Sequence, residues 1–326
     1  MSPKSARGRH ARPTATGLGR RTFLGRPLKW GLGLGALAAM GGGGYLGVTR
    51  ELLGWRRPPR PAWQLTLPRP VMVAHRGGAG VFPENTLTAF TGSAEQFGCR
   101  WLDLDARCTR DGAAVVLHDA TVERTTDGAG PVLDYDLGGL QRLDAGFRFR
   151  DADGNAPWKG RGVFIPTLQQ VLETFPDRLF TIEIKSGEAP CPRAVVQAVR
   201  AAGAAKRVLL GAASQFIFAQ IRELGPEIPS FFTFRAALGF FFSGWLGLER
   251  WYRPPHHTLQ IPPRMFGMEL VTPELLAQAR RAGVAVLVWT VNDPARMEAL
   301  LEQGVDGIVT DRPDLLAPLV AKYQGN

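Results

Sequence analysis

Residues 71–90 read VMVAHRGGAGVFPENTLTAF, and the way this stretch begins decides the fold. The run Val71–Ala74 is continuously apolar, which is typical of a strand buried on both faces of a parallel sheet. It then ends abruptly on His75 and Arg76. Arginine is mostly exposed in proteins and histidine is only intermediate in burial, so neither is explained by packing in a core. We therefore expect a parallel α/β architecture whose strand ends present chemically active groups.

The same rhythm continues to the C-terminus, where short apolar runs alternate with helical periodicity. The expected strands are Val71–His75, Arg100–Ala106, Ala114–His118, Leu179–Ile184, Val208–Gly211, Ser230–Phe234, Ala285–Thr290 and Gly307–Thr310. The expected helices are Asn85–Gln96, Thr167–Glu173, Pro192–Ala202, Gln215–Leu224, Pro273–Ala282 and Pro294–Gln303.

This alternation predicts a closed (β/α)₈ TIM barrel over residues 67–326. An open doubly wound sheet is the alternative, although no G-x-G-x-x-G loop follows the first strand. A further extended piece, Thr258–Pro262, leaves the assignment of the later strands open.

The net charge of +10 comes from the N-terminal segment. Residues 1–60 hold 12 Lys and Arg against Glu51 alone, whereas the rest of the chain holds 27 basic and 28 acidic groups. A near-neutral catalytic part does not favour nucleic acid as a partner.

Three N-terminal pieces are expected. Residues 1–29 are a basic region in which RRTFL, residues 20–24, resembles the twin-arginine export signal. Residues 30–49 carry no charge and, as a helix, are long enough for one membrane crossing, although a Gly-rich linker is the alternative. Residues 50–66 form a Pro/Arg linker. We expect a signal or anchor helix that leaves the catalytic domain outside the cytoplasmic membrane, tethered or exported.

Cys99, Cys108 and Cys191 are too few for a disulfide framework. Each is expected to be a small buried apolar residue.

Chemistry on a barrel sits at the C-terminal ends of its strands. Acids, bases and cations stand at five of the expected strand ends: His75 and Arg76, Asp103 and Asp105, His118 and Asp119, Glu183 and Lys185, and Trp289 and Asn292.

Carboxylates two residues apart on a strand share one face, as Asp103 and Asp105 do. Together with Glu183 they favour one divalent cation that prefers oxygen ligands, Ca²⁺ or Mg²⁺. The alternative is that the aspartates pair with Arg107 or Arg110.

His75 and His118 suit general acid and base catalysis, because imidazole titrates near neutrality. Arg76 and Lys185 supply positive charge for a phosphoryl group, although Lys185 would also fit as a simple partner of Glu183. The combination predicts hydrolysis of a phosphate ester.

Seven stretches in order resemble the glycerophosphodiester phosphodiesterase family and span the chain from about residue 70. They are AHRGGAGVFPENTLTAF, WLDLDARCTRDGAAVVLHDATVERTTDGAG, LDAG, IPTLQQVL, FTIEIK, VWTVND and GVDGIVTDRPD. The resemblance implies a TIM barrel that hydrolyses glycerophosphodiesters to glycerol 3-phosphate and an alcohol with a divalent metal ion.

By motif position the resemblance implies a role for each of nine residues. The implied catalytic residues are His75 and His118, the implied substrate or phosphate ligands are Arg76, Glu84, Lys185 and Trp289, and the implied metal ligands are Asp103, Asp105 and Glu183. The family pattern has Glu-x-Asp where this chain has Asp103-Leu104-Asp105. The shorter side chain puts metal affinity and preference in question.

An apolar insertion at about residues 235–257 contains Phe240, Phe241, Phe242, Trp245 and Leu246. We expect either an extra helix packed on the barrel or an exposed surface for lipid. An exposed cluster beside the catalytic rim would favour a lysophospholipase D, and a buried one would favour water-soluble glycerophosphodiesters.

His256 and His257 are expected to be loop residues rather than ligands. An inactive, membrane-tethered binding module is a further alternative.

Overall fold

The computed structural model describes residues 67–187, 190–248, 254 and 256–324. The expected N-terminal pieces, residues 1–29, 30–49 and 50–66, lie outside these residues. Within the part of the chain that is described, no helix is both long and apolar enough to span a bilayer.

Seven parallel strands form a curled sheet in the order β5-β4-β2-β1-β10-β9-β6. Their bounds are β1 Val71–Ala74, β2 Trp101–Cys108, β4 Leu179–Ile184, β5 Val208–Gly211, β6 Thr258–Ile261, β9 Ala285–Val288 and β10 Gly307–Thr310. Two isolated parallel bridges, Leu210 with Ser230 and Phe231 with Thr258, connect β5 to β6 through residues 230–231. This ring of eight chain segments confirms the α/β class and is consistent with the expected TIM barrel.

The stretch Ala114–His118 was expected to be a barrel strand, and this prediction is wrong. Residues Ala114–Val116 form β3, which pairs antiparallel with β2. Only residues 109–113 separate the two strands, whereas a parallel connection needs a crossover of about a dozen residues or more. The ring instead includes β6, which is the extended piece whose assignment the sequence left open.

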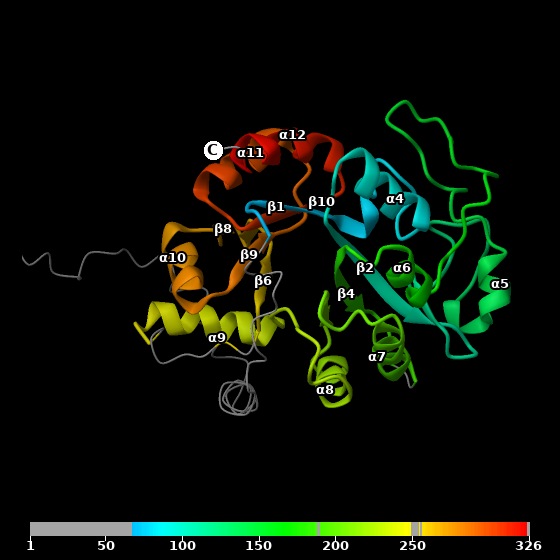
Figure 1. Cartoon of the computed structure of the whole chain (residues 1–326), viewed down its shortest axis with the longest axis horizontal. Helices are drawn as coiled ribbons and strands as arrows, with labels where there is room; N and C mark the ends of the chain where they lie inside the picture. Colours follow the sequence, from blue (N-terminus) through cyan, green and yellow to red (C-terminus); the bar gives the residue numbers. More distant parts are fainter. Residues whose placement is uncertain (1–66, 188–189, 249–253, 255, 325–326) are drawn as a thin grey trace, which may run out of the picture. The chain divides into compact units, whose positions relative to one another are not determined.

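Helices lie outside the curled sheet, between successive strands (Figure 1). Their bounds are α4 Leu87–Gln96, α5 Leu137–Gln141, α6 Leu168–Thr174, α7 Cys191–Ala201, α8 Gln215–Leu224, α9 Phe234–Trp245, α10 Pro273–Ala282, α11 Pro294–Gln303 and α12 Pro313–Gln324. Short 3₁₀ turns occupy His75–Gly77 and Val132–Asp134, and β7 Arg264–Met265 pairs with β8 Met268–Glu269 in a small hairpin. The six expected helices are confirmed to within two residues at each end.

The strands divide their side chains between two apolar clusters. Met72 and Ala74 of β1 pack outward with residues of the helices, whereas Val71 and Val73 belong to a cluster made of strand residues. The second cluster also contains Trp101, Leu179, Leu209, Leu287 and Val309. It therefore fills the inside of the curled sheet, and any polar residue further along the same strand face stands above this apolar floor.

Two of the cysteines depart from the expectation that all three are unpaired. Cys108, at the end of β2, forms a disulfide with Cys191, at the start of α7, with their Cα atoms 5.4 Å apart. The pairing of β2 with β4 brings these positions together across 83 residues of sequence, which spacing alone does not reveal. Cys99 is free and buried, as expected.

The apolar insertion forms the helix α9 and the segment after it, of which residues 249–253 and 255 are not described. Phe240 is buried against Phe232. The middle of α9 is therefore packed against the protein, as expected for an extra helix. Trp245 and Leu246 are exposed at the end of the helix. His256 and His257 lie outside any helix or strand, directly before β6, as expected, and both are buried. His256 packs against the rings of Phe218 and Phe232.

Candidate active site

Three carboxylates stand above the apolar floor of the sheet, on two neighbouring strands. Asp103 and Asp105 follow Trp101 on the inner face of β2, because alternate residues share a face. Across the β2–β4 pair Asp105 is the direct neighbour of Glu183. The side chain of Asp105 is only 6% exposed, so its charge must be compensated within the protein.

The crowding of these groups shows in the titration of Asp103. Burial raises its pKa to about 7, and although the positive charge of His75 opposes this, the charges of Asp105 and Glu183 add to it. Burial is the main cause of this shift and the two neighbouring carboxylates add to it, so a bound cation would favour the charged form of Asp103.

Two basic side chains partly neutralise the cluster. Arg76 Nε lies 3.2 Å from Asp105 Oδ2, and Lys185 Nζ lies 3.3 Å from Asp105 Oδ1 and 2.7 Å from Glu183 Oε2. The amide of Asn85 also donates to Asp105, at 3.1 Å. Lys185 thus occupies the space between the two carboxylates. In the described residues, no set of three or more His, Cys, Asp or Glu side chains is already arranged to hold a metal ion.

The sequence also allowed the aspartates to pair with Arg107 or Arg110, but the ion pairs of Asp105 are with Arg76 and Lys185. Arg107 Nε donates to the carbonyl of His118 at 2.7 Å, and Arg110 pairs with Asp136 on the surface.

His75 follows β1, and its Nδ1 lies 2.6 Å from Oδ1 of Asp311. Burial alone would lower the pKa of His75, but the hydrogen bond to Asp311 and the negative charge of Asp103 outweigh it, and the pKa is raised. Asp311 is held in turn by the amide of Asn292 at 2.7 Å. Because the carboxylate engages Nδ1, Nε2 is the nitrogen suited to exchange a proton with substrate.

Sequence reasoning assigned no role to Asp311. The signal was present, since Asp311 directly follows the last strand, β10, and β10 pairs with β1, which carries His75.

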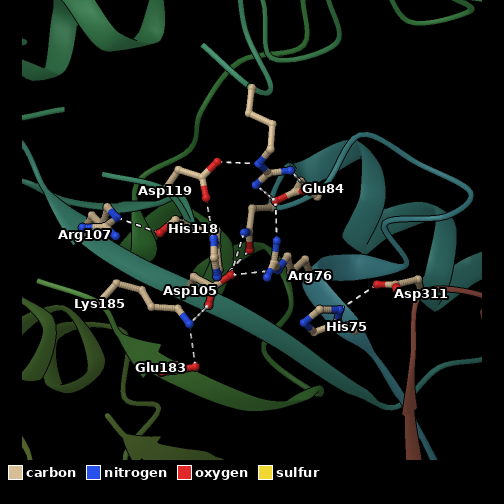
Figure 2. Close-up of polar contacts among 12 residues, drawn as sticks. His75, Arg76, Glu84, Asp105, Arg107, His118, Asp119, Glu183, Lys185 and Asp311 are labelled. Atoms are coloured by element: carbon tan, nitrogen blue, oxygen red, sulfur yellow. Dashed lines mark hydrogen bonds and ion pairs between the residues drawn. The ribbon is translucent and has the colours of Figure 1, made fainter. Parts of the chain in front are cut away.

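His118 repeats this arrangement on the other side of the cluster (Figure 2). Its Nδ1 lies 2.6 Å from Oδ1 of Asp119, the next residue. Although β3 is not a barrel strand, the hairpin brings His118 back to the end of β2, where Leu117 N donates to the carbonyl of Asp105 at 3.0 Å. The hairpin therefore delivers the second imidazole to the same rim as the first.

An arginine that sequence reasoning missed connects His118 to the loop after β1. Arg124 Nε donates to Asp119 Oδ2, and its two terminal nitrogens donate to Glu84 at 2.7 and 2.8 Å. Glu84 Oε1 also accepts from Arg76 Nη1 at 3.0 Å. Asp119 is five residues from Arg124, but Glu84 is 40 residues away, and strand periodicity does not reveal this distant contact.

The loop after β1 needs an unusual backbone to place these groups. Arg76 and Asn85 both adopt the left-handed conformation, with φ of 50° and 58°. At Gly77 a Cβ atom would lie 2.8 Å from the Cβ of Ala89, so α4 can pack this closely only against glycine. Such strained positions cluster at functional sites, where the surrounding structure holds them.

Eight of the nine expected site residues thus take part in one connected set of contacts or charges. The ninth, Trp289, follows β9 on the same rim and is 44% exposed. Two imidazoles, three carboxylates and two cations on one barrel rim define the class of site that hydrolyses phosphate esters.

Comparison with known proteins gives the same class. Residues 75–315 match the glycerophosphoryl diester phosphodiesterase family. The chain is 33% identical over 258 residues to a glycerophosphodiester phosphodiesterase of Caldanaerobacter subterraneus subsp. tengcongensis, covering 77% of this chain and 98% of that one. The chain therefore belongs to the glycerophosphodiester phosphodiesterase family and is an enzyme of the phosphoric diester hydrolase class.

Solved structures agree with the fold. A glycerophosphodiester phosphodiesterase from Agrobacterium tumefaciens is 28% identical, with a TM-score of 0.62 and coverage of 76% of this chain and 99% of that one. A phosphodiesterase from Oleispira antarctica, solved with the product sn-glycerol-3-phosphate, is 26% identical, with a TM-score of 0.60 and coverage of 77% and 97%.

The human lysophospholipase D GDPD1 is 26% identical over 276 residues, covering 77% of this chain and 86% of that one.

Proposed function

We propose that this enzyme hydrolyses glycerophosphodiesters to glycerol 3-phosphate and an alcohol, with His75 and His118 as the general acid and base. The observation that carries the proposal is the matched pair of imidazoles, each fixed through Nδ1 by a carboxylate 2.6 Å away, beside one cluster of acidic residues. One histidine removes the proton from the attacking hydroxyl, and the other protonates the departing alcohol oxygen as its bond to phosphorus breaks. The attacking group is water, or it is the 2-hydroxyl of the substrate's own glycerol. In the second case a cyclic glycerol phosphate forms as the alcohol leaves, and water then opens the ring to give glycerol 3-phosphate.

Arg76 and Lys185 are proposed to bind the phosphodiester oxygens. Asp105 and Glu84 hold the Arg76 guanidinium at the edge of the acidic cluster, where it supplies positive charge for an anion. Glu84 orients Arg76 rather than touching phosphate. Trp289 is proposed to flank the glycerol moiety.

One divalent cation, Ca²⁺ or Mg²⁺, fits the donor set, because Asp103, Asp105 and Glu183 offer hard oxygen ligands on two neighbouring strands. When bound, it would supply electrostatic stabilisation of the phosphoryl oxygens. Asp103 carries one methylene less than the family pattern has at this position, so its carboxylate reaches less far than a glutamate would.

The catalytic domain is proposed to work outside the cytoplasmic membrane, tethered or released by the segment before residue 67. The Cys108–Cys191 disulfide supports this location, because disulfides persist in oxidising compartments. Protease accessibility of the domain in intact cells tests it, since a domain that stays protected until the cells are lysed would contradict export.

A second candidate function, lysophospholipase D, is favoured by one specific observation. Phe216, Phe234, Phe266 and Trp289 follow β5, the bridged segment 230–231, β6 and β9, which are consecutive around the ring. Each is exposed, by 44–89%. Phe216 and Phe234 stand in the first turns of α8 and α9, and the segments that follow consecutive barrel strands meet on the catalytic face. These four residues, called the aromatic arc here, offer an apolar surface for an acyl chain beside the site.

The aromatic arc is not the apolar insertion singled out in the sequence. Phe240 in α9 is buried, and Trp245 and Leu246 lie at the end of α9 that leads back toward the start of β6, away from the catalytic face. The described part of the insertion therefore does not carry the proposal of a lipid substrate.

A substrate panel separates the candidates. Glycerophosphocholine, glycerophosphoinositol and lysophosphatidylcholine are offered to the purified domain, with and without a chelator, and glycerol 3-phosphate or lysophosphatidic acid is measured. Release of glycerol 3-phosphate supports the first proposal, and preferred cleavage of lysophosphatidylcholine supports the second. No cleavage of any diester would contradict both and favour an inactive binding module.

A further inference from the structure

We propose that Arg124 is a positioning residue for the reaction. It holds His118 through Asp119 and Arg76 through Glu84, so that the acid/base group and the phosphate-binding group keep one fixed separation. This inference rests on the proposed function and assigns a role to a residue that touches no reacting atom.

The first half of the arrangement orients His118. Asp119 uses both of its oxygens, since Oδ1 contacts His118 Nδ1 at 2.6 Å and Oδ2 accepts from Arg124 Nε. A carboxylate held on one side only could rotate about its own bond and take the imidazole with it. Arg124 removes that freedom.

The second half orients Arg76. The two terminal nitrogens of Arg124 grip both oxygens of Glu84, at 2.7 and 2.8 Å, and Glu84 Oε1 also accepts from Arg76. The Glu84 side chain is only 13% exposed. Burial would raise the pKa of Glu84, but Arg124 and Arg76 outweigh this and lower it, so the group stays charged.

Arg124 joins these two loops with all three of its guanidinium nitrogens. Glu84 belongs to the loop before α4, and Asp119 belongs to the loop after β3. A planar fork can satisfy two carboxylates at once, whereas the single ammonium of lysine cannot reproduce that geometry.

The test compares Arg124→Ala, Arg124→Lys and wild type in steady-state hydrolysis of glycerophosphocholine. We expect kcat to fall by about 10²-fold in both variants, the typical effect of misplacing a catalytic group by roughly 1 Å. Added guanidinium ion should restore part of the rate of Arg124→Ala, whereas it should not help Asp119→Ala. The double variant Arg124→Ala/Asp119→Asn should lose less than the product of the single losses.

Arg200→Ala is the matched control. Arg200 is 48% exposed against 47% for Arg124, and it also binds a carboxylate, Glu227 at 2.8 Å, but on α7 outside the site. We expect its kcat to equal that of wild type at a similar melting temperature. Should Arg124→Ala fail to fold, Arg124→Gln, which keeps an amide donor, takes its place in every comparison.

Wild-type kcat in folded Arg124→Ala, or a loss that guanidinium does not restore and that multiplies independently with Asp119→Asn, would overturn the positioning role. Inactive wild-type enzyme would instead overturn the proposed function, so the two failures are distinguishable.

Discussion

The ammonium of Lys185 lies 2.7 Å from the carboxylate of Glu183, two residues earlier in the chain, and 3.3 Å from Asp105 on the neighbouring strand. These oxygens are the same ones proposed to bind a divalent cation. Lys185 and a bound metal ion would therefore compete for the same carboxylate oxygens. We expect Lys185 to turn toward the phosphate when a metal ion binds.

Removal of the metal should abolish hydrolysis, and Glu183→Gln should weaken Ca²⁺ or Mg²⁺ binding by at least about tenfold, because one anionic ligand is lost. Calorimetric titration of the chelator-treated protein measures the affinity without recourse to activity. Full activity after exhaustive chelation would contradict a metal requirement.

Asp103→Glu tests the departure from the family pattern. The longer side chain reaches further toward the proposed ion, so we expect tighter metal binding in the same titration. An unchanged or weaker affinity would show that Asp103 is not positioned as a direct ligand.

Asp311→Asn should lower the pKa of His75, because it removes the negative charge that accepts from Nδ1. The wild-type pKa is raised above the ordinary value of 6.5. The Asp311 contact therefore adds stability that is fully present below pH 6.5 and is lost as pH rises through the raised folded value. NMR titration of His75 in metal-free protein checks the shift, and equal pKa values in the two proteins would refute it.

Serine substitutions at Phe216 and Phe266, the most exposed residues of the aromatic arc, should reduce cleavage of micellar lysophosphatidylcholine and leave glycerophosphocholine hydrolysis unchanged. The reason is that Phe216 and Phe266 are proposed to contact only the acyl chain, which glycerophosphocholine lacks. Trp245→Ser, at the far end of α9, is the control and should change neither rate. Equal loss with both substrates would argue against an acyl-chain surface.

Local patterns in the sequence were sufficient to place the candidate site residues near one edge of the sheet, because polar residues interrupt or directly follow apolar strands there. Val71–Ala74 followed by His75 is the clearest case, and the Asp103–Asp105 spacing correctly placed both carboxylates on one face. These features depend on strand periodicity, which is a local property.

Non-local pairings could not be obtained in this way. The antiparallel direction of β3 depends on the short turn at residues 109–113, and periodicity does not record strand direction. The Cys108–Cys191 disulfide and the contact between Asp311 and His75 join segments that only the closed sheet brings together. Arg124 was missed for the same reason.

The central claim is that His75 and His118 perform the proton transfers in diester hydrolysis. Its most direct test is the rate of glycerol 3-phosphate release from glycerophosphocholine by wild type, His75→Ala and His118→Ala, each shown to be folded by its melting temperature. We predict losses of about 10²–10⁴-fold in each variant. A folded variant that retains nearly the wild-type rate would contradict the account.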